Sequence, residues 1–399
     1  MQQSYQAKRS VEVCPDIVVV MAAFVVLASH MSITIRQVSG SRGIRAFIQF
    51  PFTLYKGSKY WVPPMNTSEK QTLDPALNPA QAHSPAALFM AYKHNKPAGR
   101  IAAIALGGSH GVEGRFGWYD VIDDFEVSKL LIATAEQWLR EKGAKQVKGP
   151  MGFTNLDKAG MLTFGFDELP TISTLYNYPY YNDHLIALGY EKSAEYVEFE
   201  FKVPEAIPEK VTAFVDVIAK RYGVRALDEL TGITIQRYGQ ELFDLINETH
   251  RNLYGFKLLS EEMKQYYIKK YLPFVRSDFI ALIVNEQDKL VAYALTMPSY
   301  AKAFQKARGS LFPFGYWHIW QATRSISRAD LLLIGVTDTL RNKGVTSLIF
   351  HRLLNTFMKY GIQRIESNPE LEDNQQVQAL WQKYEYRQHK RRRVYQRDL

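Results

Sequence analysis

Hydrophobic and polar positions recur along the chain with two different spacings. Residues 194–203 alternate between polar and apolar side chains, which predicts a half-buried strand. Residues 126–142 and 343–359 carry apolar side chains at helical spacing, and a glycine follows each segment, which predicts two amphipathic helices. Both halves of the chain run in the order helix, strands, helix, strand, helix, strand. The pattern therefore predicts an α/β (α+β) protein made of two similar domains.

The boundary between the domains is expected just after the strand at 194–203. Pro204 and Pro208 interrupt the pattern there, and an isolated helix at 209–222 follows. We expect a first domain at 31–204, a linker helix and strand at 205–238, and a second domain at 239–399.

Residues 1–30 are expected to lie outside the fold. Their apolar run of twelve residues, 17–28, is shorter than the about 20 residues that span a bilayer. Lys8 and Arg9 precede the run, as in a signal peptide, but the sequence favours an upstream extension with Met31 as the natural start. Cys14 is the single cysteine, so no intrachain disulfide and no thiolate metal cluster are expected.

The net charge of the chain is unevenly distributed. Lys and Arg number 49 against 40 Asp and Glu, which gives +9, and residues 387–399 hold six basic residues against one acidic residue. This basic end is either a solvated tail or a site that attracts phosphate, on a ligand or on an anionic membrane. Nucleic acid is an unlikely partner, because no stacking motif or basic groove is present. We expect a cytoplasmic protein, with a peripheral contact to the inner membrane as a further option.

The segment from Leu331 to Leu354 carries the strongest chemical signal. An apolar strand at 331–336 leads into a basic loop with Gly344, and a helix begins there. Amide N–H groups at the start of a helix are unpaired and partly positive, so they bind phosphate oxygens. Gly344 lets the backbone approach a ligand, because it has no Cβ atom. The loop is therefore predicted to hold a pyrophosphate.

This loop resembles the acyl-CoA-binding signature of the GNAT superfamily of N-acetyltransferases. Arg341, Gly344 and Thr346 fill the three fixed positions, although Thr346 replaces the usual small residue. The resemblance implies two tandem domains, each with a mixed, mainly antiparallel twisted sheet flanked by helices. It implies that acyl-CoA or acetyl-CoA binds with its thioester along the strand and its pyrophosphate on the loop, at Ile334, Gly335, Val336, Arg341, Asn342, Lys343, Gly344, Val345 and Thr346.

The resemblance extends over roughly residues 240–399. Asn374 begins a helix where the superfamily has an Asn, and Trp381 takes the place of a Tyr that often protonates the leaving thiolate. Indole is not a practical acid, so that role is open, and Tyr384 is a nearby candidate. The N-terminal half resembles the fold more faintly, with Asp123 and Asp124 where phosphate would bind. We expect it to be a degenerate copy that shapes the acceptor site.

Other segments narrow the family further. GPMGFTNLDKAGMLTFGF at 149–166 and YNYPYY at 176–181 resemble a bacterial family of mostly unassigned tandem GNAT proteins, which is linked to the bacterial ceramide synthases. The resemblance implies an N-acyltransferase that uses a CoA thioester and an amine acceptor, with a lipid (sphingoid-base) amine first and a small polar amine second. A non-catalytic CoA-binding or lipid-binding protein of the same fold is the alternative.

Acyl transfer to an amine needs a group that takes up a proton. Glu366 is the first candidate, followed by Glu372 and Asp373, although each could be a surface or capping carboxylate. Asn374 either binds substrate or caps its helix. No His, Asp and Glu residues stand at metal-ligand spacing, so no metal is expected.

The aromatic segment at 311–320 (LFPFGYWHIW) has two interpretations. It is either part of an aromatic core or a channel wall or interfacial surface that admits a lipid, with basic residues at its rim. His318, within this segment, is a further candidate for catalysis.

Overall fold

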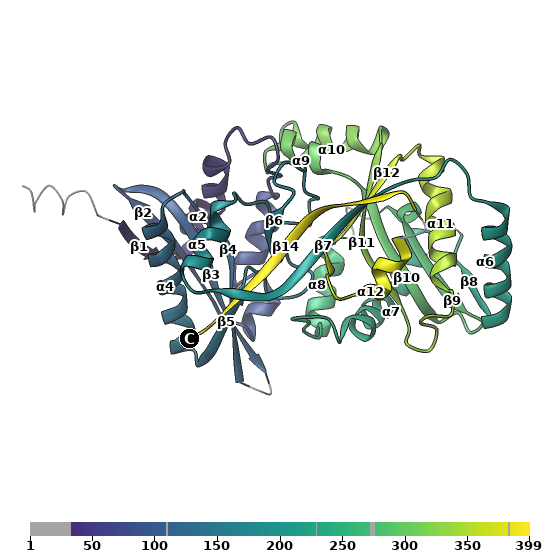
Figure 1. Ribbon diagram of the computed structural model, residues 1–399, viewed down its shortest axis with the longest axis horizontal. Coiled ribbons are helices and arrows are strands. Elements are labelled where there is room, and N and C mark those ends of the chain that lie inside the picture. Colours follow the sequence, from purple (N-terminus) through teal and green to yellow (C-terminus); the bar gives the residue numbers. More distant parts are fainter. Residues whose placement is uncertain (1–32, 109–110, 229, 272–275, 382–383) are drawn as a thin grey trace, which may run out of the picture.

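The computed structural model describes residues 33–108, 111–228, 230–271, 276–381 and 384–399. The extension predicted at 1–30 lies outside the described residues. One mixed sheet runs through the molecule in the order β1-β2-β3-β4-β5-β14-β7-β12-β11-β10-β9-β8, with helices packed on it (Figure 1). The predicted fold class, a mainly antiparallel mixed sheet flanked by helices, is confirmed.

The N-terminal half builds one end of this sheet. Its helices and strands are β1 (Ile33–Gln37), α2 (Gly40–Leu54), α3 (Asn66–Leu73), the 3₁₀ helix η1 (Pro79–Ala82), β2 (Ala86–Lys93), β3 (Lys96–Gly108), β4 (Gly111–Val121), α4 (Phe125–Glu141), β5 (Ala144–Gly149), β6 (Met161–Phe164), α5 (Tyr180–Ala187) and β7 (Glu191–Lys202).

The C-terminal half builds the other end and repeats the order of the first. It consists of α6 (Glu209–Tyr222), β8 (Val224–Ala226), α7 (Gly232–His250), α8 (Glu261–Tyr271), the 3₁₀ helix η3 (Ser277–Phe279), β9 (Ile280–Asn285), β10 (Leu290–Pro298), α9 (Ala301–Ala307), α10 (Gly315–Arg324), β11 (Arg328–Val336), α11 (Thr346–Lys359), β12 (Arg364–Ser367), β13 (Glu370–Leu371), α12 (Gln375–Trp381) and β14 (Tyr386–Asp398).

The two halves are joined by an exchange of their last long strands. Strand β14, from the end of the chain, pairs with β5 of the N-terminal half, whereas β7 pairs with β12 of the C-terminal half. β7 and β14 also pair with each other over most of their length and cross the centre of the molecule together (Figure 1). The division of the chain at 204–239 stays a prediction, because each sheet half contains a strand from the other half of the sequence.

Alternating side chains direct the helices to opposite faces of the C-terminal sheet. Ala281 and Ile283 of β9 face a core that includes Ile349 and Leu353 of α11. The intervening Leu282 and Val284 face the core formed with α7 and α8. The sheet therefore separates α11 from α7 and α8, and any site that spans β11 has access to both faces.

The basic C-terminal end is neither a solvated tail nor a phosphate site. Lys390 and Arg392 are fully buried in β14, where both contact the buried Glu198 of β7. Arg393 pairs with Glu195 at 2.8 Å. The sequence pattern shows positive charge but not its partners, which lie about 200 positions away on the neighbouring strand.

None of the helices within the described ranges is long and apolar enough to cross a membrane.

Candidate functional site

Strand β11 leaves its neighbour at the point where the thioester is expected. It pairs in parallel with β12 only from Arg328 to Leu331, while β11 itself continues to Val336. Leu332 is an extra residue opposite β10, because Leu295 pairs with Leu333 and Thr296 pairs with Leu331. A bulge of this kind redirects side chains and is common beside active sites. The strand therefore exposes backbone between the parted edges, along Leu332 to Val336.

Gly335 occupies a tight position on this strand. A Cβ atom there would lie 2.6 Å from Cε1 of Tyr293 and 2.8 Å from Oγ1 of Thr249. The Tyr293 hydroxyl lies 3.2 Å from Nδ1 of His250, at the end of α7. The missing side chain thus lets the strand pack against these polar groups, while Ile334 and Val336 pack toward the α11 core.

The loop after β11 presents uncapped amides at the start of α11. Arg341, Asn342 and Lys343 are exposed, and Arg341 pairs with Asp338 at 2.6 Å. Gly344 has a φ of +80°, a left-handed conformation that favours glycine. No side chain caps the helix, and no protein oxygen among the described residues accepts a hydrogen bond from the amide of Gly344 or Val345. These two amides therefore lack a protein acceptor, as an anion site requires, although Val345 itself is only 1% exposed.

The matching helix of the N-terminal half is closed to anions. The Asp124 side chain accepts hydrogen bonds from the amides of Glu126 and Val127, at 3.1 and 3.3 Å. Asp124 also contacts Lys93, and these partners lower the pKa of its carboxyl although partial burial opposes the shift. A carboxylate thus occupies the position that a phosphate would need. The contrast with α11 supports an anion site in the C-terminal half alone.

A cavity of about 470 Å³ lies between the two halves, on the α8 side of β11. Its size is within the range of small-molecule sites. The bulged residue Leu332 of β11 and the residues Gly117 to Asp120 of β4 both line it. Because β4 parts from β5 and carries its own extra residue there, the two strand bulges face one central cavity. We call this space the central cavity.

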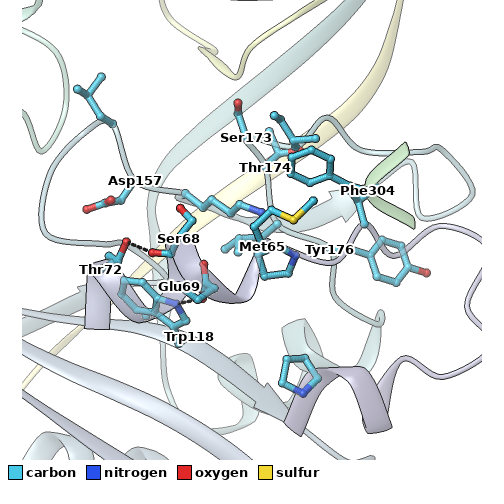
Figure 2. A pocket seen from close by; sticks show the side chains of 18 of the residues that line it. Met65, Ser68, Glu69, Thr72, Trp118, Asp157, Ser173, Thr174, Tyr176 and Phe304 are labelled. Atoms are coloured by element: carbon cyan, nitrogen blue, oxygen red, sulfur yellow. Dashed lines mark hydrogen bonds between the residues drawn. The ribbon is translucent and has the colours of Figure 1, made fainter. Parts of the chain in front are cut away.

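The central cavity has a polar end and an apolar end. Figure 2 shows Glu69, Thr72 and Asp157 on one side, and Tyr176 and Phe304 on the other, with Ser173 and Thr174 beside Phe304. Apolar lining residues come from both halves of the chain, namely Trp61, Val62, Met65, Met161, Ile172, Met297, Phe304, Leu311 and Leu332. Such a lining fits a ligand with a polar head and an apolar chain.

Charged groups at the polar end have shifted pKa values. Burial lowers the pKa of the Lys158 ammonium to about 8, although the carboxylate of Glu69 opposes the shift. Burial raises the pKa of the Asp157 carboxyl. Glu69 accepts a hydrogen bond from Nε1 of Trp118 at 2.7 Å, and Lys270 donates to Oγ1 of Thr72 at 2.9 Å. A pKa of about 8 leaves part of Lys158 neutral near neutral pH, whereas an exposed lysine is almost fully protonated there.

The loop that carries Lys158 is fixed by both halves of the molecule. Thr154 contacts the Tyr267 hydroxyl of α8 at 2.5 Å, and Asn155 donates to the carbonyl of Tyr254 at 3.0 Å. Gly152 has no room for a Cβ atom, which would lie 2.3 Å from Cβ of Asp157. The motif at 149–166 thus places Asp157 and Lys158 in the wall of the central cavity.

Glu366 lies in a buried ionic cluster on the neighbouring strands. It contacts Nζ of Lys390, which is 3.5 Å from Glu198, and it stands opposite Asp330 of β11. Burial raises the pKa of Glu366 to about 8, although Lys390 favours the ionised form. Glu366 lines a second cavity of about 460 Å³ beneath α9 and α10, together with Ser299, Arg328 and His318.

The same cluster contains a group with metal-ligand geometry. Glu198, Glu366 and His389 bring one atom each within 4.8 Å of one another. Lys390 already contacts Glu366, and Arg392 already contacts Glu198. We therefore assign the two carboxylates to ion pairs rather than to a metal ion.

Two other predicted site residues lie at α12. Oδ1 of Asn374 accepts a hydrogen bond from the amide of Val377 at 3.4 Å, as a helix-capping residue does. The ring of Tyr384 packs against that of Phe350 of α11, with the two ring centroids 6.3 Å apart. Burial raises the pKa of the Tyr384 hydroxyl. The side chain of Trp381 lies outside the described residues. The structure therefore brings the loop residues 341–346 together with the exposed strand, whereas Glu366 and Asn374 stand apart from that loop.

Sequence reasoning missed Lys158 and Asp157. A charged pair inside a glycine-rich apolar segment was the available signal, because such a pair is rarely buried without a function or a partner.

No protein-family model matches the chain. It is 25% identical over 379 residues to Protein YghO of Escherichia coli, with 92% of this chain and 95% of that protein covered. It is also 25% identical over 374 residues to the bacterial ceramide synthase of Caulobacter vibrioides, with 89% and 95% covered.

Two solved structures share the fold at low sequence identity. A tandem GNAT protein from the clavulanic acid biosynthesis pathway aligns with a TM-score of 0.56 and 11% identity, covering 92% of this chain and 98% of that one. The glucosamine N-acetyltransferase region of a fungal multi-domain β-N-acetylglucosaminidase also aligns with a TM-score of 0.56, at 12% identity, covering 92% of this chain and 38% of that one. The predicted fold is confirmed: this chain is a tandem protein of the GNAT fold.

Proposed function

We propose that the chain is an acyltransferase that moves an acyl group from a CoA thioester to an amine. The observation that carries the proposal is the turn at Gly344 and Val345. Its amides have no acceptor among the described residues, and it follows a strand that has parted from its neighbour. The central cavity on the opposite face of that strand supplies a second substrate site. An acyl donor and an acceptor could thus meet at β11 without sharing one pocket.

The residues fit acyl-CoA or acetyl-CoA as the donor. The amides of Gly344, Val345 and Thr346 would bind the diphosphate, and Arg341 and Lys343 would add positive charge. Asn342 completes this loop. Ile334, Gly335 and Val336 would run along the pantetheine and thioester. Transfer forms a bond from the amine nitrogen to the acyl carbon and breaks the carbon–sulfur bond, so CoA leaves as the thiol.

The acceptor amine must lose a proton for this bond to persist. Lys158 is placed for that role if the amine occupies the polar end of the central cavity, because its pKa of about 8 leaves part of it neutral at pH 7–8. Glu366 remains the base predicted from the sequence, and it would act from the second cavity. Tyr384 as the acid that protonates the thiolate, and Asn374 as a substrate ligand, remain proposals as well.

A lipid amine of the sphingoid-base type is the proposed acceptor. The curated relative named as a bacterial ceramide synthase covers nearly the whole chain, and the central cavity combines a polar end with an apolar end. A small polar amine is the second choice. We propose a cytoplasmic location, with a peripheral contact to the inner membrane as a further option.

Thiol release tests this function. The chain would be incubated with acetyl-CoA or palmitoyl-CoA, and with sphinganine or glucosamine as acceptor. We expect free CoA thiol and an N-acyl product, detected by mass spectrometry, with sphinganine. CoA binding without thiol release across all acceptors would support a non-catalytic binding protein, the alternative that Trp381 allows. No CoA binding would refute the transferase and the CoA-binding protein, and would leave a lipid-binding protein.

A further inference from the structure

Helices α9 and α10 lie at one edge of the molecule (Figure 1). The loop between them and the first turn of α10 expose large aromatic side chains. Phe312 is 85% exposed, Phe314 72%, Tyr316 69% and Trp317 55%. We call these four residues the aromatic surface. Single exposed apolar residues are ordinary, but four in six consecutive positions form a patch that indicates a binding partner.

The segment that carries the aromatic surface is basic. Residues 299–329 contain five Lys or Arg and no Asp or Glu. Lys302, Lys306 and Arg308 are exposed, and none of them takes part in a salt bridge among the residues that the structure describes. The basic side chains of strand β14, by contrast, form ion pairs with carboxylates of the neighbouring strand. Lys302, Lys306 and Arg308 therefore supply positive charge without a salt-bridge partner among the described residues, in the same segment as the aromatic surface.

The aromatic surface adjoins the wall of the central cavity. Leu311, the residue before Phe312, lines the cavity and is itself 37% exposed. Phe304 of α9, labelled in Figure 2, lines the same apolar end. A ligand that leaves the cavity past Leu311 thus meets the aromatic surface first.

We propose that the aromatic surface docks on an anionic lipid bilayer and opens the central cavity toward it. Phe, Tyr and Trp side chains with a basic rim are typical of surfaces that lie at the headgroup level of a membrane. Lys302, Lys306 and Arg308 would attract the anionic headgroups. Docking itself does not depend on the enzymatic activity. Only the further step, in which a single-chain amphiphile passes from the bilayer into the central cavity, rests on the proposed function.

Sedimentation with vesicles tests the docking. The full chain would be mixed with vesicles of phosphatidylcholine alone and with vesicles that contain 40% phosphatidylglycerol. We expect binding to the anionic vesicles, at least tenfold weaker binding to the neutral ones, and loss of binding at high salt. A triple variant, Phe312→Ser with Phe314→Ser and Trp317→Ser, should bind at least tenfold more weakly, and Lys302→Ala with Lys306→Ala should weaken binding to anionic vesicles only.

A matched control separates this surface from general hydrophobicity. Ile233 and Leu258 are 83% and 74% exposed on other segments, so Ile233→Ser with Leu258→Ser should leave vesicle binding unchanged. Equal loss in both sets of variants, wild-type binding in the triple variant, or no vesicle binding by the wild type would overturn the proposal. So would a dimer that forms in solution and is broken by the triple variant.

Activity distinguishes failure of the docking from failure of the proposed function. If both proposals hold, the folded triple variant should keep its turnover of a short, water-soluble amine but lose turnover of a long-chain amine presented in anionic vesicles. Equal turnover of the vesicle-bound amine by the triple variant and the wild type would overturn the entry route while leaving the acyltransferase intact.

Discussion

The substitution Gly344→Val tests the predicted diphosphate site most sharply. Gly344 has a φ of +80°, and a β-branched residue is strongly disfavoured in that conformation. A Cβ atom would also lie 3.1 Å from Cδ1 of Ile218 and 3.3 Å from Cζ of Phe214, both on α6. The loop must therefore leave its left-handed turn or move away from α6. Either change turns the amide of Val345 away from the ligand.

The expected loss follows from the bonds that the turn would make. A hydrogen bond from an amide to a charged group contributes about 1.5–3 kcal/mol. Loss of one such bond should weaken CoA binding roughly 10- to 100-fold. Isothermal titration with CoA measures this directly. The variant should remain folded, because a non-glycine residue in a left-handed turn costs about 1–3 kcal/mol.

Gly361→Val is the matched control at the other end of α11. Gly361 has a φ of +67°, and a Cβ atom there meets no atom within 4 Å. Both variants should lose about 1–3 kcal/mol of stability to the left-handed turn, and Gly344→Val should lose somewhat more because it also presses on α6. Only Gly344→Val should lose CoA affinity. If Gly344→Val binds CoA as tightly as Gly361→Val, the diphosphate does not lie on this turn and the reasoning fails.

Three further predictions address the interior of the molecule. In the wild type, the rate should rise with pH through about 8, because the neutral form of the Lys158 side chain is the one that accepts a proton. Lys158→Met should lower turnover and remove this ionisation from the pH–rate profile. A Lys158→Met profile that keeps this ionisation would assign it to another group. Ser173→Trp, which fills the central cavity, should abolish turnover of long-chain amines while CoA binding measured by titration stays within twofold, and unchanged turnover would place the acceptor elsewhere. Lys390→Met should destabilise the fold by about 3–5 kcal/mol in urea, because it leaves the buried Glu366 without its charged partner, whereas Glu198 keeps Arg392. The double variant Lys390→Met with Glu366→Leu should recover part of that loss, and a double variant as unstable as the single one would contradict the pairing.

The local pattern predicted most of the helices and strands. Alternation at 194–203 and helical spacing at 126–142 correspond to β7 and α4, and the loop at 341–344 does begin a helix. These features depend on neighbouring residues, which the sequence shows directly. The helix α11 starts at Thr346, a few residues later than the pattern indicates, because the turn at Gly344 interrupts it.

The pairing of distant segments could not be predicted in the same way. Local sequence cannot show that β14 lies between β5 and β7. For that reason the sequence indicates that Arg392 faces solvent or a phosphate group. In the structure, its side chain is buried against Glu198. The central cavity is hidden for the same reason, since its walls come from both halves. The helices α9 and α10 could not be predicted from the sequence, because aromatic residues, Pro and Gly interrupt the helical spacing of apolar residues at 301–324.

Hydrogen–deuterium exchange with and without CoA measures the central claim directly. If the diphosphate lies on the start of α11, CoA should slow exchange in peptides that cover residues 341–350. The matching turn at 123–127 should not change, because Asp124 already occupies its amides. Protection at 123–127 without protection at 341–350, or no protection in either turn at saturating CoA, would contradict the account.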